Sequence, residues 1–261
     1  MNEGNHAPIS YGAFAGIVVV YLLIIQGLGV LLSLGSDLGY AEFPDIESTL
    51  RGITIPVSLS VVFVIAIISW LGWWPDITTE RPKVASWVWI VPGLLVVAAA
   101  MVTDYGNLAE QDASLILTVA GTSLLVGIGE ELMFRGVSIQ VLRRHGLTEA
   151  NVALWSSVIF GGVHITNVIA EGPRAVFQVV IVAFAGYFFY LTYRVSGTIV
   201  APILMHAYWD FAQFSHAAGV ADPQPNVFQN IPLLFLVIAG VVVYRRRDRI
   251  EAAHPVPVPA Q

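Results

Sequence analysis

The chain has 261 residues, of which 56% are hydrophobic and only 11% are charged, whereas soluble globular domains carry about 25% charged residues. This deficit, together with a mean hydropathy of +0.75, indicates an integral membrane protein that sits in a lipid bilayer. The lack of cysteine excludes disulfides, thiolate metal sites and a cysteine nucleophile. A net charge of -6 with few, scattered basic residues excludes nucleic acid as a partner.

Long apolar stretches predict an all-α fold, a polytopic transmembrane helix bundle with about eight membrane helices. A helix needs roughly 20 apolar residues to cross a bilayer, and most of the stretches approach or reach that length. In chain order they are Tyr11–Leu34, Ile53–Trp74, Trp87–Val102, Leu115–Leu142, Val152–Ala170, Ala175–Tyr193, Thr198–Phe214 and Ile231–Tyr244.

The same pattern divides the chain into five parts. They are a disordered N-terminus (1–10), N-terminal transmembrane helices (11–114), core transmembrane helices (115–214), a last transmembrane helix with a basic end (215–251) and a disordered tail (252–261).

The distribution of basic residues predicts the orientation, because Lys and Arg collect on the cytoplasmic side of membrane proteins. With the N-terminus in the cytoplasm, the outer loops contain only Arg51 and Arg174. The inner loops and the tail then contain Arg81, Lys83, Arg143, Arg144, Arg194, Arg245, Arg246, Arg247 and Arg249. Both termini are therefore expected to be cytoplasmic. Arginine supplies nearly all of the basic residues, which favours a prokaryotic cell membrane.

Three ionisable residues interrupt the predicted fourth helix. Each charged group at membrane depth costs about 2.5–3.5 kcal/mol on insertion scales, so Glu130, Glu131 and Arg135 need a structural or functional reason. Glu131 and Arg135 are four residues apart and can form an ion pair on one helix face. Glu130 lies about 100° further round the helix. It is either a protonated, hydrogen-bonded core carboxyl or a functional group.

The predicted fifth helix carries His164 directly after Phe160, Gly161, Gly162 and Val163. Glycines in a membrane helix let a neighbouring backbone approach closely. The histidine by itself fits a hydrogen-bonded core residue as well as a ligand.

The predicted seventh helix carries His206 and Asp210, which project from one face because they are four residues apart. Pro202 is expected to kink this helix one turn earlier and to free a backbone carbonyl. A local hydrogen bond between His206 and Asp210 is the structural alternative to a functional site.

Comparison of the three depths favours a site. At 1.5 Å per residue, Glu130, His164 and His206 lie roughly 20, 18 and 14 Å from the inner ends of their helices. All three positions fall near the middle of a hydrocarbon core about 30 Å thick. A carboxylate and two imidazoles that converge there can activate water, directly or through a metal ion.

The three patches together resemble the CPBP family of intramembrane proteases, which includes type II CAAX prenyl endopeptidases and bacteriocin-processing or self-immunity proteins. The motifs of that family, EExxxR, FxxxH and HxxxN/D, occur here in the same order. They are Glu130-Glu131-x-x-x-Arg135, Phe160-x-x-x-His164 and His206-x-x-x-Asp210. The resemblance covers about residues 115–214.

The resemblance implies an endopeptidase that hydrolyses peptide bonds, with a peptide or membrane-anchored protein as substrate. Glu130 would be the general base and His164 would assist it, while Glu131 and Arg135 form a supporting pair. His206 and Asp210 would bind the oxyanion or orient the substrate carbonyl. Asp210 stands where the prenyl endopeptidases usually have Asn, and an ionised Asp cannot donate a hydrogen bond.

The sequence does not decide between a metal-dependent and a metal-free mechanism. His164, His206 and one carboxylate would give the three-ligand site of a catalytic Zn²⁺, whereas the family has also been interpreted as metal-free glutamate proteases. Two other functions compete with proteolysis: a non-catalytic membrane scaffold or immunity protein, and a proton-coupled transporter. A transporter needs a polar path across the membrane, and only Asn167 and Gln178 continue one towards the outer face.

Overall fold

The computed structural model describes residues 9–34, 43–80, 84–168, 174–220 and 231–246. The ends that the sequence predicts to be disordered lie outside these residues, apart from Ile9 and Ser10. Within the described ranges the chain is helical, and the extended pairings are two isolated bridges, Phe43 with Ala218 and Thr79 with Thr198. The predicted all-α class is therefore confirmed.

The described residues form a succession of α, π and 3-10 helices. Their bounds are α1 (Tyr11–Leu22), η1 (Leu23–Gly27), α2 (Leu28–Leu32), α3 (Ile46–Thr49), η2 (Leu50–Thr54), α4 (Ile55–Leu71), α5 (Trp74–Thr78), η3 (Ser86–Trp89), α6 (Ile90–Val102), α7 (Tyr105–Ala109), α8 (Ala113–Glu131), η4 (Leu132–Ser138), α9 (Ile139–Arg144), α10 (Glu149–Val163), η5 (His164–Asn167), α12 (Arg174–Ser196), α13 (Val200–Phe214) and α14 (Ile231–Arg245).

Four helical segments in the described part of the chain are long and apolar enough to cross a membrane. They are Tyr11–Leu32, Ile46–Leu71, Ala113–Arg144 and Gln178–Ser196. The predicted count of eight is not confirmed, because α10, α13 and α14 have only 15 residues each. The helical segment 86–102 is also shorter than a full span.

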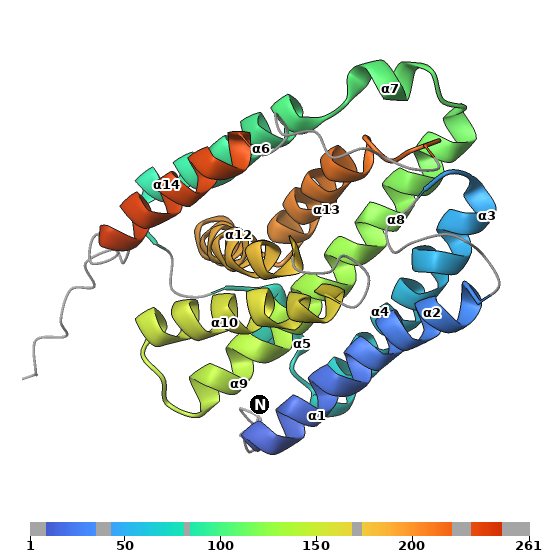
Figure 1. Cartoon of the computed structure of the whole chain (residues 1–261). Coiled ribbons are helices and arrows are strands. Elements are labelled where there is room, and N and C mark those ends of the chain that lie inside the picture. The colour runs from blue at the N-terminus through green and yellow to red at the C-terminus, as the bar shows by residue number, and fades with distance from the viewer. Residues whose placement is uncertain (1–8, 35–42, 81–83, 169–173, 221–230, 247–261) are drawn as a thin grey trace, which may run out of the picture.

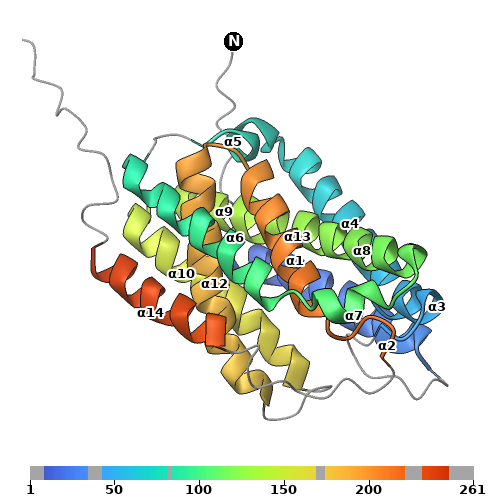
Figure 2. The same ribbon diagram turned by 90° about the horizontal axis from the view of Figure 1, so that it is seen from above.

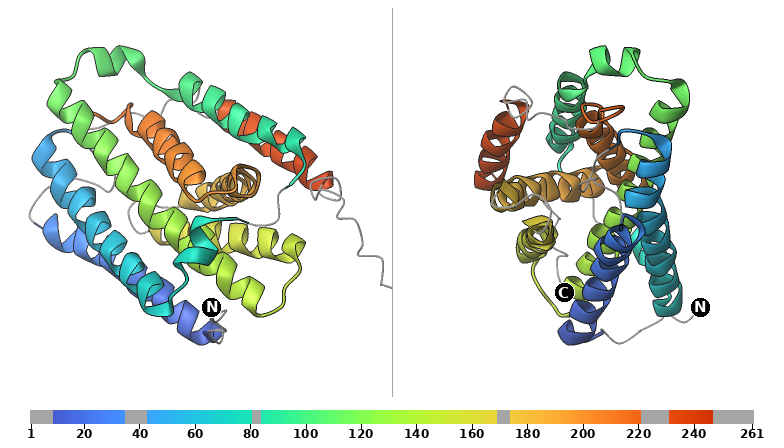
Figure 3. Two further views of the ribbon diagram at one scale, coloured as in Figure 1. Left: turned by 180° about the vertical axis from the view of Figure 1, so that it is seen from behind. Right: turned by 45° about the vertical axis from the view of Figure 1, so that its right-hand side comes forward.

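The segment that contains α8, η4 and α9 is the central element of the bundle (Figure 1). On one side it packs against α4, and on the other side against α13. Figure 2 shows α6 and α13 running alongside one another, and Figure 3 shows α14 beside α6 on the outside of the bundle. The two motif-bearing helices α10 and α13 both contact α12, which brings the three motifs to one region.

Close helix contacts at two glycines make this convergence possible. A Cβ atom on Gly127 of α8 would lie 2.7 Å from the backbone oxygen of Ile203 in α13. A Cβ atom on Gly161 of α10 would lie 2.5 Å from the backbone oxygen of Val179 in α12. The expectation of close backbone approach is correct for Gly161 but not for Gly162, where a Cβ would meet nothing within 4 Å.

Two local features differ from the sequence prediction. The fourth helix is not a continuous α-helix, because η4 is a π-helical stretch that begins directly after Glu131; such stretches often occur at functional sites. Pro202 lies in the first turn of α13, where a missing N–H needs no partner, and not inside the helix. Pro202 has no N–H to donate to the carbonyl of Thr198. This carbonyl accepts a hydrogen bond from the Ser196 hydroxyl at 3.2 Å.

Candidate active site

The predicted pair of Glu131 and Arg135 is formed and is fully buried. Arg135 Nη1 donates to Glu131 Oε1 at 2.9 Å, and the two side chains are 1% and 0% exposed. The other guanidinium nitrogen, Nη2, donates to the backbone oxygen of Gly186 in α12 at 2.9 Å. Arg135 therefore links the helix after Glu131 to α12, and both charges have partners in a low-dielectric environment.

Glu131 has a second partner that the sequence did not indicate. His206 Nδ1 lies 2.7 Å from the same Oε1 atom of Glu131 that Arg135 contacts. Because an ionised carboxylate only accepts hydrogen bonds, Nδ1 of His206 carries a proton. The Nε2 atom of His206 is then the one that faces the rest of the site.

Glu130 and Asp210 approach this Nε2 atom from two helices. The distances are 3.7 Å from Glu130 Oε2 and 3.5 Å from Asp210 Oδ2 to His206 Nε2. The Oε2 atom of Glu130 is buried and has no hydrogen-bond partner among the residues that the structure describes. The Glu130 side chain as a whole is 18% exposed and that of Asp210 is 15% exposed, and His164 is also half-buried.

Phe160 is the common packing surface of the site. The guanidinium of Arg135 lies over its ring at 4.1 Å. The rings of His164 and His206 meet Phe160 edge to face, with centroid distances of 5.1 Å and 5.8 Å. Phe189 of α12 stacks on the imidazole of His206, with a centroid distance of 4.6 Å. The two histidines, which are far apart in the chain, thus contact one aromatic ring, as the predicted convergence requires.

His164 has a defined tautomer when its ring is neutral. Its Nδ1 atom lies 2.8 Å from the backbone oxygen of Phe160. A carbonyl can only accept, so Nδ1 carries the proton and Nε2 is left as the basic nitrogen. His164 begins the 3-10 helix η5, at the point where α10 ends. The motif residue is therefore placed at a change of helix type.

The donors do not form a complete metal site. Both imidazoles have Nδ1 held by an oxygen, which is the usual arrangement around a ligating histidine. However, no group of three or more His, Asp or Glu side chains among the described residues is arranged to hold a metal ion. The zinc ion predicted at His164 and His206 stays a prediction.

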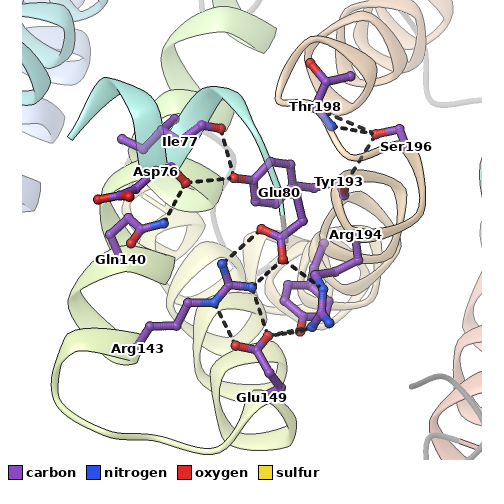
Figure 4. Close-up of polar contacts among 11 residues, drawn as sticks. Asp76, Ile77, Glu80, Gln140, Arg143, Glu149, Tyr193, Arg194, Ser196 and Thr198 are labelled. Atoms are coloured by element: carbon purple, nitrogen blue, oxygen red, sulfur yellow. Dashed lines mark hydrogen bonds and ion pairs between the residues drawn. The ribbon is translucent and has the colours of Figure 1, made fainter. Parts of the chain in front are cut away.

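A second buried ionic cluster lies at the α9 end of the α8–α9 segment, and the sequence did not predict it. Arg143 of α9 donates to both oxygens of Glu80 and to both oxygens of Glu149, at 2.7–2.9 Å. Arg194 of α12 is 2% exposed and contacts Glu80, Glu149 and the hydroxyl of Tyr190. Figure 4 shows how these side chains connect the segment after α5 with α9, α10 and α12.

The cluster is electrostatically balanced and structural in character. Burial raises the pKa of Glu149, but hydrogen bonds and charge from Arg143 and Arg194 outweigh it, so that the pKa is lowered overall. A cavity of about 340 Å³ beside it is lined by Pro75, Asp76, Thr79, Gln140 and Arg143. In the sequence, Arg143 and Arg194 were visible only as basic residues of predicted inner loops, and they indicated the orientation of the protein and not an ionic cluster.

The fold and the site together define a helical membrane protein whose buried centre holds carboxylates and imidazoles from three elements. Residues 112–212 match the family described as Type II CAAX prenyl endopeptidase Rce1-like. This segment includes all of the candidate residues, and its match to that family confirms the resemblance of the three motifs. The match indicates a protease, that is, a hydrolase of peptide bonds. Comparisons with curated proteins and with solved structures gave no match.

Proposed function

We propose that the protein is an intramembrane endopeptidase in which Glu130 activates the attacking water. The supporting observation is the Oε2 atom of Glu130, which is buried, has no hydrogen-bond partner in the described part of the chain and lies 3.7 Å from His206 Nε2. This distance is too long for a direct hydrogen bond and is compatible with one bridging water. The Glu130 side chain as a whole is 18% exposed.

The chemical step uses the residues in distinct roles. Glu130 removes one proton from water as the oxygen attacks the scissile carbonyl, and the same proton then moves to the leaving amine nitrogen. His164 assists through its basic Nε2 atom. His206 donates from Nε2 to the oxyanion while Glu131 holds its Nδ1 at 2.7 Å. Asp210, whose Oδ2 atom lies 3.5 Å from His206 Nε2, orients His206 and stabilises its protonated form. In this role the carboxylate of Asp210 does not have to donate a hydrogen bond.

The family match supports a proposal for the substrate, and the composition and the basic residues support one for the location. We propose a peptide or protein that is held near the membrane, with a prenylated C-terminal CAAX sequence as the first class to test. The proposed location is a prokaryotic cell membrane with both termini in the cytoplasm, supported by the nine basic residues of the predicted inner loops and tail.

The direct test uses purified protein in proteoliposomes and two quenched fluorescent peptides that differ only in a farnesyl group on the CAAX cysteine. The wild-type protein is expected to cleave at least one of them. Glu130→Gln and His206→Ala are each expected to lower kcat by about 10²–10⁴-fold, the usual contribution of general acid–base catalysis. Full activity in either variant, or no cleavage of either peptide by the wild type, would contradict the proposal.

The same assay tests the predicted zinc ion. Treatment with 1,10-phenanthroline, followed by metal analysis, separates the two mechanisms. Loss of cleavage with recovery on addition of Zn²⁺ supports a metal held by His164 and His206. Unchanged cleavage by metal-depleted protein supports water activation by Glu130 without a metal.

A further inference from the structure

Three amide side chains form a hydrogen-bonded chain near the end of the helix that carries His164. Gln26 Nε2 donates to Asn167 Oδ1 at 3.0 Å, and Asn167 Nδ2 donates to Gln178 Oε1 at 3.0 Å. The three residues come from η1, η5 and α12, so this amide chain joins elements that are distant in the sequence. Asn167, its central member, is only 5% exposed.

The amide chain lies one helical turn from the proposed site. His164 and Asn167 are the first and last residues of η5. In a 3-10 helix, residues three apart eclipse one another and are about 6 Å apart along the axis. Hydrogen bonds that fix Asn167 therefore also fix the rotation of η5 about its axis, and with it the direction of the His164 side chain.

The other side-chain hydrogen bonds in η5 cannot do this. The hydrogen bond of His164 Nδ1 goes to Phe160 in the preceding turn, and that of the Thr166 hydroxyl goes to Val163. Both are local and would move together with the helix end. Among the side-chain hydrogen bonds of residues 164–167 to the described part of the chain, those of Asn167 reach η1 and α12.

We infer that Asn167, held between Gln26 and Gln178, is a positioning residue that orients His164 for the proposed hydrolysis. This inference rests on the proposed function. Asn167 uses one acceptor and one donor, and a buried polar group that loses its partner costs about 1–3 kcal/mol. The chain of amides thus favours one placement of η5 against η1 and α12.

The test measures kcat, KM and the pH dependence of cleavage for Asn167→Leu, Gln26→Met and Gln178→Met. Small displacements of catalytic groups can cost about 100-fold in rate. Asn167→Leu is therefore expected to lower kcat per folded molecule by at least tenfold with little change in KM, and to shift the pH–rate profile. If Asn167→Leu does not fold, Gln26→Met and Gln178→Met each remove only one bond and are expected to show smaller effects of the same kind.

Gln140→Leu is the matched control. Gln140 is another buried amide, 6% exposed, and it donates to the backbone oxygen of Asp76 at the opposite end of the central segment. It is expected to lower stability without a change in kcat per folded molecule or in the pH–rate profile. An additional double variant, Gln26→Met with Asn167→Leu, should be no slower than Asn167→Leu alone, because the two residues act through one chain.

The outcomes separate this inference from the proposed function. If Glu130→Gln is inactive while Asn167→Leu keeps the wild-type kcat per folded molecule and pH–rate profile, the amide chain is merely structural and the inference is wrong. If Glu130→Gln cleaves like the wild type, the proposed function itself is wrong.

Discussion

At the scale of single residues, Arg135 is the side chain on which the site depends most for its geometry. One end of its guanidinium binds Glu131, the other binds the carbonyl of Gly186, and its face lies on Phe160. The planar guanidinium satisfies the three contacts at the same time. An ammonium group is a point charge and cannot reproduce this arrangement.

Arg135→Lys is therefore expected to destabilise the protein although the charge is kept. The loss of the hydrogen bond to Gly186 should cost about 1.5–3 kcal/mol, the usual value for a bond to a charged group. Unfolding in SDS, followed by circular dichroism, measures this. Arg51→Lys is the control, because Arg51 pairs with Glu47 at the surface with both side chains more than half exposed. Equal stability of the two variants would contradict the argument.

At the scale of elements, the contact between α10 and α12 decides whether the second motif reaches the site. Gly161 lies against the backbone of α12, and a Cβ atom there would also lie 2.7 Å from the Cβ of Ala183. Backbone atoms cannot move aside as a flexible side chain can. The contact is therefore a steric requirement on one residue, although the sequence contains two adjacent glycines.

Gly161→Ala and Gly162→Ala form a matched pair for this point. Gly161→Ala should separate α10 from α12, destabilise the protein by at least about 1–3 kcal/mol and reduce cleavage. Gly162→Ala should be neutral or stabilising by about 0.5–1 kcal/mol, because alanine favours the helix and its Cβ meets nothing. Thermal unfolding of both variants is the measurement, and a larger effect at Gly162 would contradict the structure.

At the scale of the whole molecule, the ionic cluster of Glu80, Arg143, Glu149 and Arg194 joins four segments at one end of the bundle (Figure 4). Buried ion pairs contribute only when their partners are complete. Glu149, the first residue of α10, lies outside the four candidate membrane spans, and its pKa is lowered from the ordinary value of 4.5.

The stability of the bundle is therefore expected to depend on Glu149 above pH 4.5 and to lose this contribution in acid. Because the pKa of Glu149 is lower in the folded protein than in the unfolded chain, its stabilisation is present above the unfolded value of 4.5. It is lost as the pH falls through the folded value. Glu149→Gln should lower the unfolding temperature at neutral pH, and the difference from wild type should shrink below pH 4.5. Glu47→Gln, at an exposed pair, should show almost no difference at either pH.

The side-chain contacts that the sequence predicts best are those that depend on local spacing. Glu131 and Arg135 are four residues apart, so helical geometry alone places them together. The contact of His206 with Glu131 joins residues 75 apart, and the contact of Asn167 with Gln26 joins residues 141 apart. Such contacts depend on which helix faces pack together, and hydropathy patterns in a membrane protein carry little of that information because lipid-facing and buried residues are both apolar.

The sequence by itself determined the all-α class and the resemblance that the match of residues 112–212 confirms, and it singled out the polar residues that the structure brings together. It did so because the cost of polar groups in a bilayer makes each of them stand out from the apolar background. Only the tertiary structure decided the partners. Glu131 contacts both Arg135 and His206, and Glu130 has a buried oxygen with no partner within the described ranges. Close packing at glycines and mutual satisfaction of buried polar groups select these partners, and neither can be evaluated until the helices are in contact.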